Sequence, residues 1–428
     1  MKTELYHYRI HPLVVPLNTP KHLEIQPLET QYAFSEKATY TVKVCSLTRT
    51  LHGDFAPQDN EVAATVENGK LFFDYTFDAE EECYIRVFKK GWKDCIVQLS
   101  VYALAEDLFA LRPLKGDFHV HTCGSDGRET APVAAANYRE QGFDFTVISD
   151  HHAYAPSVEA QEAYQEIPLG MRIVNGEEVH TPNNYVHVIH FGGTSSVNAL
   201  FEDDTEEYEK EVAEIIAETK DIPYEDAFTW AANIWAVRKI HAVGGLAVFC
   251  HPFWISDVHN VPNELSRVFL MGKDFDAFEL IGGQSAHENN LQIALYNDLR
   301  AAGCIMPVLG ASDSHGTINR GLFNKMFTIV FAEENEVQSI ITAVKKGMAA
   351  PVEVYEDSVN YSVHGSFRHV AYTRFLLEHY FAPQALLCRE EGILMRLYLL
   401  GDKAAGERLT ALAGRTDDYW RRSFGLAQ

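Results

Sequence analysis

Histidine and carboxylate side chains recur along the middle of the sequence, each time at or just after the end of a short apolar run. The groups are Asp117 to Thr122 with Asp126, Asp150 to His152, Glu177 with Glu178, His187 with His190, His251, and Asp313 to His315. Imidazole nitrogens together with carboxylate oxygens are suited to Zn, Mn or Fe, whereas Mg and Ca prefer sites made of oxygen alone. We therefore expect the six groups to converge on one metal centre.

The first group shows how a strand could hold an ion. His119 and His121 are two residues apart, and such residues point to the same side of an extended chain. A single pair of this kind is weak evidence, but its recurrence after five further apolar runs indicates a site. If the runs are parallel strands of a barrel, their C-terminal ends meet on the face where barrel enzymes build their active sites.

Composition excludes several classes of protein. The chain has 428 residues, 46% hydrophobic and 22% charged, which is typical of a globular protein of two or three domains. Its net charge of -24 argues against long nucleic acid as a partner, because phosphate backbones require a basic surface. A small phosphorylated substrate stays compatible with this charge, since bound metal ions would reverse the local field.

The sequence contains no sign of a membrane or secretory segment. Residues 1–20 have no apolar core of a signal peptide, and no stretch reaches the ~18 to 20 apolar residues of a membrane span. The seven cysteines are scattered without C-x-x-C spacing, as expected of reduced thiols. These features predict a cytoplasmic protein with no membrane partner. Cys123 and Cys250, which lie beside the candidate ligands, are interpreted as small buried thiols.

Residues 1–112 are predicted to form a small all-β domain resembling a sandwich. Apolar and polar residues alternate there with the period of half-buried strands, and Asn68-Gly69 is a strong signal for a two-residue hairpin. The expected strands lie within 39–44, 70–77, 84–88 and 96–102.

From residue 113 to about 350 the pattern changes to strand, loop and helix. Thr130 and Ser285 are expected to begin two of the helices as N-caps. This alternation predicts a parallel sheet, and the ligands at its strand ends favour a barrel. Residues 195–242 are interpreted as a helical insertion over the barrel mouth, with ordinary sheet-covering helices as an equal alternative. Residues 351–428 are predicted to be a helical extension, compatible with docking or homo-oligomerisation.

The motifs together resemble those of the polymerase and histidinol phosphatase (PHP) family over residues 114–350. In order along the chain they are Asp117-x-His119-x-His121, Ser125-Asp126-Gly127, Ile148-Ser149-Asp150-His151, Gly176-x-Glu178, His251-Pro252 and Ser312-Asp313-Ser314-His315. The resemblance implies an α/β fold built on a distorted (β/α)7 barrel. It also implies two or three divalent ions (Zn, Mn or Fe) and the hydrolysis of a phosphoester.

The resemblance also implies three ligand sets. A first ion would be bound by His119, His121, Glu178 and Asp313. A second would share Glu178 and use His187 and His251. A third would take Asp126, His151 and His315.

For some positions in these ligand sets, the sequence offers more than one candidate residue. Glu177 competes with Glu178 for the bridging position, and Glu178 is preferred because it stands two residues after a glycine, as in the family. His180 and His190 compete with His187. Asp117 is expected to orient the first histidines.

Further groups could act on a phosphate. His152 is a candidate donor to a substrate oxygen, and Arg128 and Arg320 are candidates for fixed positive charge.

Three functions are compatible with these residues. The first is a phosphoesterase acting on a nucleotide, sugar phosphate or amino-alcohol phosphate. The second is an amidohydrolase-like enzyme that cleaves a C-N or C-O bond, which the third ligand set disfavours. The third is a non-catalytic regulatory module, which is disfavoured because degeneration should delete ligands and none is missing.

Overall fold

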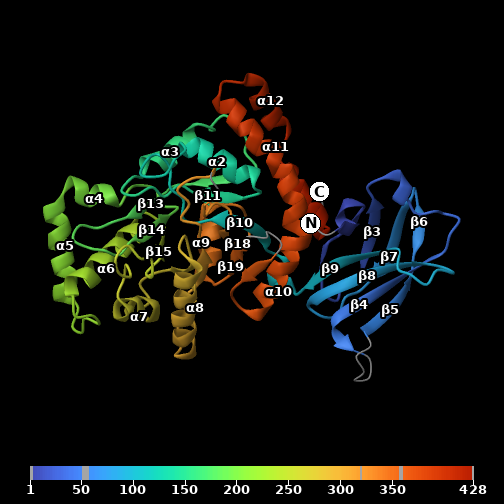
Figure 1. The fold of residues 1–428 in the computed structure, drawn as a ribbon, viewed down its shortest axis with the longest axis horizontal. Helices are drawn as coiled ribbons and strands as arrows, with labels where there is room; N and C mark the ends of the chain where they lie inside the picture. Colours follow the sequence, from blue (N-terminus) through green and yellow to red (C-terminus); the bar gives the residue numbers. More distant parts are fainter. Residues whose placement is uncertain (1–2, 51–56, 319–320, 356–359, 427–428) are drawn as a thin grey trace. The chain divides into compact units, whose positions relative to one another are not determined.

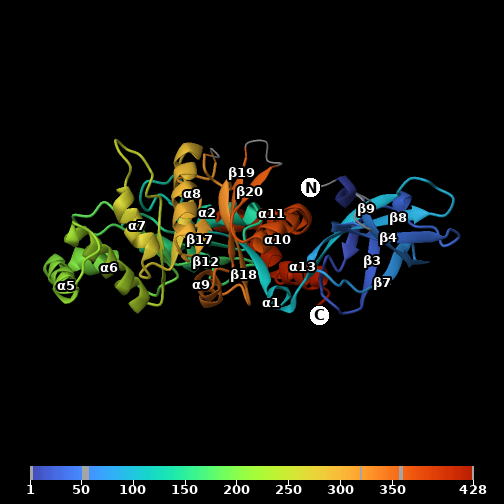
Figure 2. The ribbon, with the colours of Figure 1, turned by 90° about the horizontal axis from the view of Figure 1, so that it is seen from below.

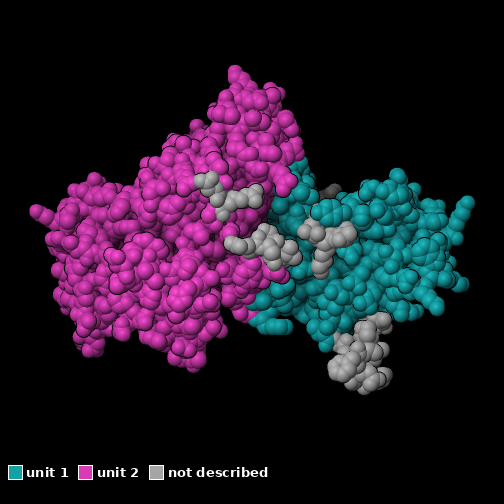
Figure 3. All heavy atoms as spheres, viewed as in Figure 1, with its two compact units in different colours: residues 1–112, 367–387, 414–428 teal, residues 113–366, 388–413 magenta. Residues whose placement is uncertain are grey.

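The computed structural model describes residues 3–50, 57–318, 321–355 and 360–426. The chain divides into two compact units, shown in different colours in Figure 3. Unit 1 comprises residues 1–112, 367–387 and 414–428, and unit 2 comprises residues 113–366 and 388–413. The helices that the sequence predicts as a C-terminal extension are thus distributed between both units. In the described ranges, no helix combines the length and apolar character needed to cross a membrane.

Unit 1 contains two β-sheets, as the alternation of residues 1–112 predicts. The four-stranded sheet has the order β1 (Tyr8–His11), β3 (Lys21–Pro27), β7 (Lys70–Tyr75), β6 (Thr65–Glu67). The five-stranded sheet has the order β2 (Val14–Pro16), β9 (Val97–Leu104), β8 (Glu81–Lys89), β4 (Tyr40–Thr50), β5 (Pro57–Ala63). Asn68 and Gly69 join β6 to β7 with φ values of 51° and 78°, which confirms the predicted hairpin.

The remaining elements of unit 1 are short turns and helices. They are η1 (Thr3–Tyr6), η2 (Thr30–Tyr32), α1 (Glu106–Phe109), α10 (Phe367–Leu376), the π-helical turn η3 (Leu377–Phe381) and α13 (Arg415–Phe424). Helix α11 (Ala382–Leu399) begins in unit 1 and continues into unit 2, which also contains α12 (Lys403–Ala411).

Unit 2 is built on two further sheets (Figures 1 and 2). One has the order β12 (Arg172–Val174), β11 (Phe145–Val147), β10 (Arg112–Asp117), β18 (Met326–Ala332), β19 (Ala349–Val354), β20 (Tyr361–Val363). The other has the order β13 (Gly176–Val179), β14 (Val188–Phe191), β15 (Leu246–Phe249), β16 (Ala277–Ile281), β17 (Val308–Gly310). Strands of both sheets contribute to one buried core, for example Val147, Val248 and Val330.

The predicted parallel sheet is only partly correct. The pairs β10–β11, β11–β12, β15–β16 and β16–β17 are parallel, whereas β13–β14, β14–β15 and β18–β19 are antiparallel. Residues 180–187 contain no helix, and a parallel crossover needs a dozen or more residues. Strand β14 therefore returns antiparallel to β13. The hydrogen-bonded order is that of two sheets, so the closed seven-stranded barrel stays a prediction.

Helices cover the outer face of the second sheet. They are α4 (Asn198–Asp203), α5 (Thr205–Glu218), α6 (Ala227–Ala242), α7 (Asn263–Met271) and α8 (Ala286–Ala301). Along β15, Leu246 and Val248 face the core between the sheets, while Ala247 and Phe249 pack with these helices. Helices α5 and α6 of residues 195–242 therefore cover the sheet, which is the alternative that the sequence left open. The insertion over a barrel mouth stays a prediction. Helices α5 and α6 lie side by side in both ribbon views (Figures 1 and 2).

Three other helices complete unit 2. They are α2 (Ala131–Glu140), α3 (Ala155–Glu162) and α9 (Val337–Lys345). Two isolated bridges, Val120 with Ser314 and His151 with Glu178, connect the chain where strands of the two sheets end. Both bridges involve or adjoin predicted ligands, so the joined edges of the sheets position the candidate site.

Candidate metal centre

Glu178 lies at the centre of the predicted ligands. Strand β13 alternates its side chains between faces, so Glu178 points to the histidines and Glu177 points away from them. Six imidazole nitrogens lie within 3.5 Å of the Glu178 carboxylate, three beside each oxygen. They belong to His119, His121 and His151 at Oε2, and to His180, His187 and His251 at Oε1. The carboxylate itself is fully buried.

The first predicted ligand set comes together around Oε2. The Nε2 atoms of His119 and His121 lie 3.0 Å apart, and each lies 3.3 Å from Glu178 Oε2. Asp313 Oδ1 lies 3.3 Å from His119 Nε2 and 3.0 Å from His121 Nε2. Four ligand atoms from three strand ends thus face one point.

The second predicted set faces the other oxygen. His187 Nδ1 lies 2.9 Å and His251 Nε2 lies 3.1 Å from Glu178 Oε1. Cys250 Sγ lies 3.9 Å from the same oxygen and is buried, so the interpretation of this cysteine as a buried thiol holds. The same interpretation is wrong for Cys123, which is exposed. Because the two oxygens face different histidines, Glu178 can give one oxygen to each of two ions.

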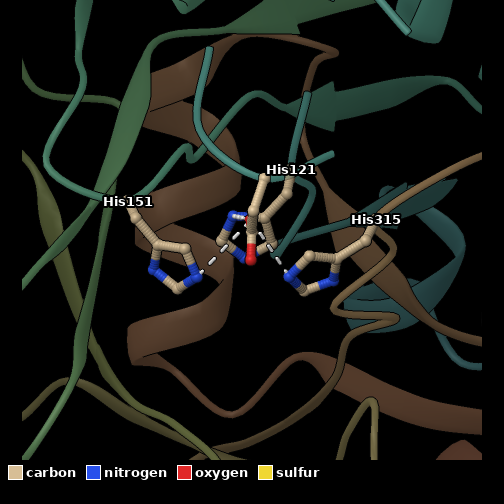
Figure 4. Close-up of side chains that lie close together, drawn as sticks. His121, His151 and His315 are labelled. Carbon is tan, nitrogen blue, oxygen red and sulfur yellow. Dashed lines mark ion pairs between the residues drawn. The ribbon is translucent and has the colours of Figure 1, made fainter. Parts of the chain in front are cut away.

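The third predicted set surrounds Asp126, which follows the turn after β10. Its Oδ1 lies 3.3 Å from His315 Nε2, 3.7 Å from His151 Nε2 and 3.9 Å from His121 Nδ1. Figure 4 shows His151 and His315 on opposite sides of His121, with the rings directed toward the space between them. These four residues form a group whose ligand atoms all lie within 4.8 Å of one another. This set is the most exposed of the three, since the Asp126 side chain is 58% exposed.

The donor atoms fit divalent ions. Ligand atoms bound about 2.0 to 2.2 Å from one ion lie roughly 3.0 to 3.6 Å from each other, and the first set has separations of 3.0 to 3.3 Å. His187 Nδ1 is buried and has no hydrogen-bond partner among the residues that the structure describes, although Glu178 Oε1 is 2.9 Å away. The atoms are therefore close without the direction of a hydrogen bond, as expected of two ligands that face an ion.

Electrostatics agree with an ionised carboxylate at the centre. Burial alone would raise the pKa of Glu178, but the charge of His119 and the hydrogen bonds from His119, His121 and His151 outweigh it. Together they hold the pKa of Glu178 well below its usual range. A carboxylate that stays ionised is the form that binds metal.

Glu279 orients the first histidine, and sequence reasoning missed it. Its Oε2 lies 3.0 Å from His119 Nδ1, and both side chains are buried. This contact directs His119 Nε2 toward Glu178, which is the usual arrangement of a carboxylate behind a metal-binding imidazole. The available signal was a glutamate inside the apolar strand β16.

Asp117 occupies a different place from the one expected. Its Oδ1 accepts hydrogen bonds from the backbone N-H groups of Ser312 (2.9 Å) and His119 (3.3 Å), and its Oδ2 accepts from the Tyr138 hydroxyl (3.0 Å). Asp117 therefore fixes backbone beside the site, while Glu279 contacts the imidazole. The backbone N-H groups require an acceptor because they are buried.

Asp150 supports the turn that carries Asp126. Its Oδ1 accepts hydrogen bonds from the Thr122 backbone N-H at 2.7 Å and the Ser125 hydroxyl at 2.7 Å. Its Oδ2 accepts from the Thr122 hydroxyl at 2.6 Å. The carboxylate thus accepts three hydrogen bonds from the turn, and His151 is the member of this motif that faces Glu178.

Glu177 and His190 form a separate buried pair on the opposite face of the sheet. His190 Nδ1 lies 3.2 Å from Glu177 Oε1, and the two residues are partners in the register of β13 and β14. Glu177 also accepts hydrogen bonds from Ser196 and from the backbone N-H of Val197 and the amide of Asn198. The geometry therefore assigns the position among the histidines to Glu178 and leaves His190 outside it.

The candidates for phosphate contact lie at the rim or beyond the described residues. His152 is half-exposed, with Nδ1 3.8 Å from Glu202 Oε1, and it lines an open depression of ≈ 710 Å³. Arg128 is exposed and lies beside Gly316, since a β-carbon on that glycine would be 3.1 Å from Arg128 Cδ. Arg320 lies outside the described residues. The roles of these three residues stay predictions.

Comparison with known proteins gives only distant similarities. No protein-family model matches the chain, and no curated protein matches it. A similar solved structure is a two-domain protein from Bacteroides vulgatus containing a predicted PHP-like metal-dependent phosphoesterase. It has a TM-score of 0.41 and 19% identity, and the match covers 63% of this chain and 71% of that chain.

Two further structures match a smaller part of the chain. One, from Bifidobacterium adolescentis, is named a metal-dependent phosphoesterase, with a TM-score of 0.32, 21% identity, and coverage of 47% of this chain and 88% of that chain. The other is an amidohydrolase from Chromobacterium violaceum with bound sulfate, with a TM-score of 0.32, 17% identity, and coverage of 48% and 88%. Two of the three are named metal-dependent phosphoesterases.

Proposed function

We propose that this chain is a metal-dependent hydrolase of the PHP type that cleaves a phosphoester in a small phosphorylated substrate. The proposal rests on the position of the Glu178 carboxylate. Each of its two oxygens lies next to a different group of three imidazoles. A carboxylate so placed can bridge two ions. Zn, Mn and Fe are the candidates, because the donors combine imidazole and carboxylate.

Divalent ions held by these residues would supply a hydroxide at neutral pH and positive charge for the oxygens of a phosphoester. The protein's own residues hold the ligand atoms in position. Glu279 Oε2 accepts the proton of His119 Nδ1. With an ion bound, Nε2 would give up its proton and offer its lone pair to the ion that Glu178 also faces. The first set is buried around His119, His121 and Glu178, whereas Asp126 is open to solvent. We infer that substrate approaches from the Asp126 side.

Rim residues would then meet the rest of the substrate. Arg128 lies beside Gly316, the residue after His315, where a guanidinium could pair with phosphate oxygens. His152 lies at the edge of the open depression and could donate a proton to the leaving oxygen. A nucleotide, a sugar phosphate or an amino-alcohol phosphate would suit this arrangement, and the acidic chain disfavours long nucleic acid.

The test compares the protein before and after chelation on an aryl phosphate and then on a panel of phosphorylated metabolites. We expect hydrolysis to disappear after chelation and to return with Mn or Zn. His119→Ala should abolish turnover, whereas the exposed His287→Ala should retain it. Amide and lactone substrates form a second arm, and hydrolysis of these alone would favour the amidohydrolase-like alternative. No bound metal and no activity with any divalent ion would contradict the proposal.

A further inference from the structure

His180 lies on the same side of the chain as the bridging glutamate. It follows Glu178 by two residues at the end of β13, so both side chains point to one face, as those of His119 and His121 do. Its backbone N-H donates a hydrogen bond to Asn198 Oδ1 at 3.2 Å, and Asn198 also donates to the Glu178 carbonyl at 3.1 Å. The main chain at His180 is therefore held in place relative to Glu178.

The ring of His180 is enclosed by residues of the candidate centre. Its Nε2 lies 2.9 Å from His151 Nδ1 and 3.5 Å from Glu178 Oε1. Its face stacks on His187, with ring centroids 3.7 Å apart and an angle of 24° between the planes. The side chain is only 19% exposed, so the ring is directed into the centre rather than into solvent.

A single hydrogen bond joins His151 to His180, and it does not account for the approach of both rings to Glu178. A neutral imidazole has one N-H and one lone pair, so the contact between His151 and His180 uses one nitrogen of each ring. Glu178 already has five other imidazole nitrogens within 3.3 Å. An ion would instead accept the lone pairs of both rings and the charge of the carboxylate. The ligand atoms of His151, Glu178 and His180 all lie within 4.8 Å of one another, as a metal site requires.

We propose that His180 is an additional metal ligand, which binds a divalent ion together with Glu178 and His151 Nδ1. The inference rests on the proposed metal-dependent function and adds a tenth protein ligand to the nine of the three sets. It has a consequence for His151, whose Nε2 faces Asp126 at 3.7 Å. Because a neutral ring offers one lone pair, His151 serves either the His180 position or the Asp126 position. An ion bound by His151 would then occupy the position beside His180 or the one beside Asp126, depending on which nitrogen of His151 binds it.

The experiment measures metal binding rather than turnover alone. Wild-type protein, His180→Ala and the exposed control His287→Ala are stripped of metal, loaded with Zn²⁺ or Co²⁺, and titrated against a chelator. We expect His180→Ala to bind one ion at least about tenfold more weakly and to change the visible absorption of bound Co²⁺. His287→Ala should match the wild type. His180→Gly with added imidazole should recover the wild-type Co²⁺ spectrum, a result that a purely structural role would not produce.

The outcomes separate this inference from the proposed function. Unchanged affinities and an unchanged Co²⁺ spectrum in His180→Ala, with a metal-binding and active wild type, would overturn the role of His180 alone. A wild type that binds no metal would overturn both. If the alanine variant does not fold by circular dichroism, His180→Gln provides the same comparison with a polar side chain retained.

Discussion

The carboxylate of Glu279 shows how much of the centre depends on residues that bind no ion themselves. It lies behind His119 and determines which nitrogen of that ring faces Glu178. Its second oxygen is buried without a hydrogen-bond partner among the described residues, so the contact with His119 is its principal fixed interaction. A change at this position should therefore act on metal binding through the orientation of one imidazole.

We expect Glu279→Gln to weaken metal affinity about 10- to 100-fold, which is the usual effect of removing the carboxylate behind a metal-binding histidine. Chelator competition followed by metal analysis gives the measurement. The exposed Glu264→Gln, on α7, is the matched control and should bind metal as the wild type does. Equal affinities for both variants would show that Glu279 does not orient His119.

A second prediction at this scale concerns Lys115 on β10. Burial lowers the pKa of Lys115 from 10.5 to about 7, and its Nζ donates to the Gln141 carbonyl and to Asn324 Oδ1. Between these two pKa values the unfolded chain binds the proton that the folded chain has released. The free energy of unfolding should therefore rise with pH in this window.

The expected slope is at most about 1.4 kcal/mol per pH unit. Urea unfolding of the wild type and of Lys115→Met between pH 7 and pH 9 measures it as a difference between the two proteins. The wild type should gain stability relative to the variant as the pH rises. A constant difference across this range would contradict the lowered pKa of the lysine.

At the scale of elements, the ends of helices show where local sequence is sufficient. Ser285 caps α8 in a full capping box, in which its hydroxyl accepts from the Glu288 backbone N-H and the Glu288 carboxylate accepts from the Ser285 backbone N-H. Thr130 stands at the same position of α2, but its side chain makes no capping hydrogen bond. The sequence suggested both caps, and the structure distinguishes them.

Ser285→Ala should therefore lower the free energy of unfolding by about 1 kcal/mol. Thr130→Ala is the matched control at an N-cap without the hydrogen bond, and it should cost much less. Thermal or urea unfolding of the two variants provides the comparison. An equal loss in both would mean that the hydrogen bonds of the capping box contribute little.

Strand ends show both the strength and the limit of sequence-based prediction. The i, i+2 spacing and the position after apolar runs were enough to single out the six groups of candidate residues, because both rules are local. The division of these residues into three ligand sets depended on family resemblance. The assignment of Glu178 over Glu177 depended on family resemblance, since alternation alone does not say which face is inside. Glu279 was missed because its partner His119 is 160 residues away in the sequence. The antiparallel direction of β14 was also missed, because it follows from the short connection between β13 and β14.

At the scale of the whole molecule, the candidate centre belongs to one of the two compact units. All nine predicted ligands lie in unit 2, within residues 113–366. Ions bound only to the folded form should stabilise this unit, by about 2.7 kcal/mol at a metal concentration 100 times the dissociation constant. Unit 1 contains none of the predicted ligands.

Hydrogen exchange should show this difference. Adding Zn²⁺ or Mn²⁺ to stripped protein should slow exchange of the amides in β13 and β14 by up to roughly 100-fold, with little change in β8 of unit 1. In His119→Ala the metal should have a much smaller effect. Equal slowing of exchange in both units, or none in either, would place the ions elsewhere.

The neighbouring glutamates of β13 carry a consequence for how this strand can vary. Glu178 faces the histidines, and Glu177 anchors the segment at Val197 and Asn198. Deleting one residue from the loop after β13 could shift the strand forward by one position. Glu177 would then lie among the histidines, and Gly176 would take the place of Glu177 next to Val197 and Asn198. A carboxylate would still be offered to the ions, but the 197–198 segment would lose its acceptor. The strand thus contains a second carboxylate that could face the histidines, but no second residue that could accept the hydrogen bonds of the 197–198 segment.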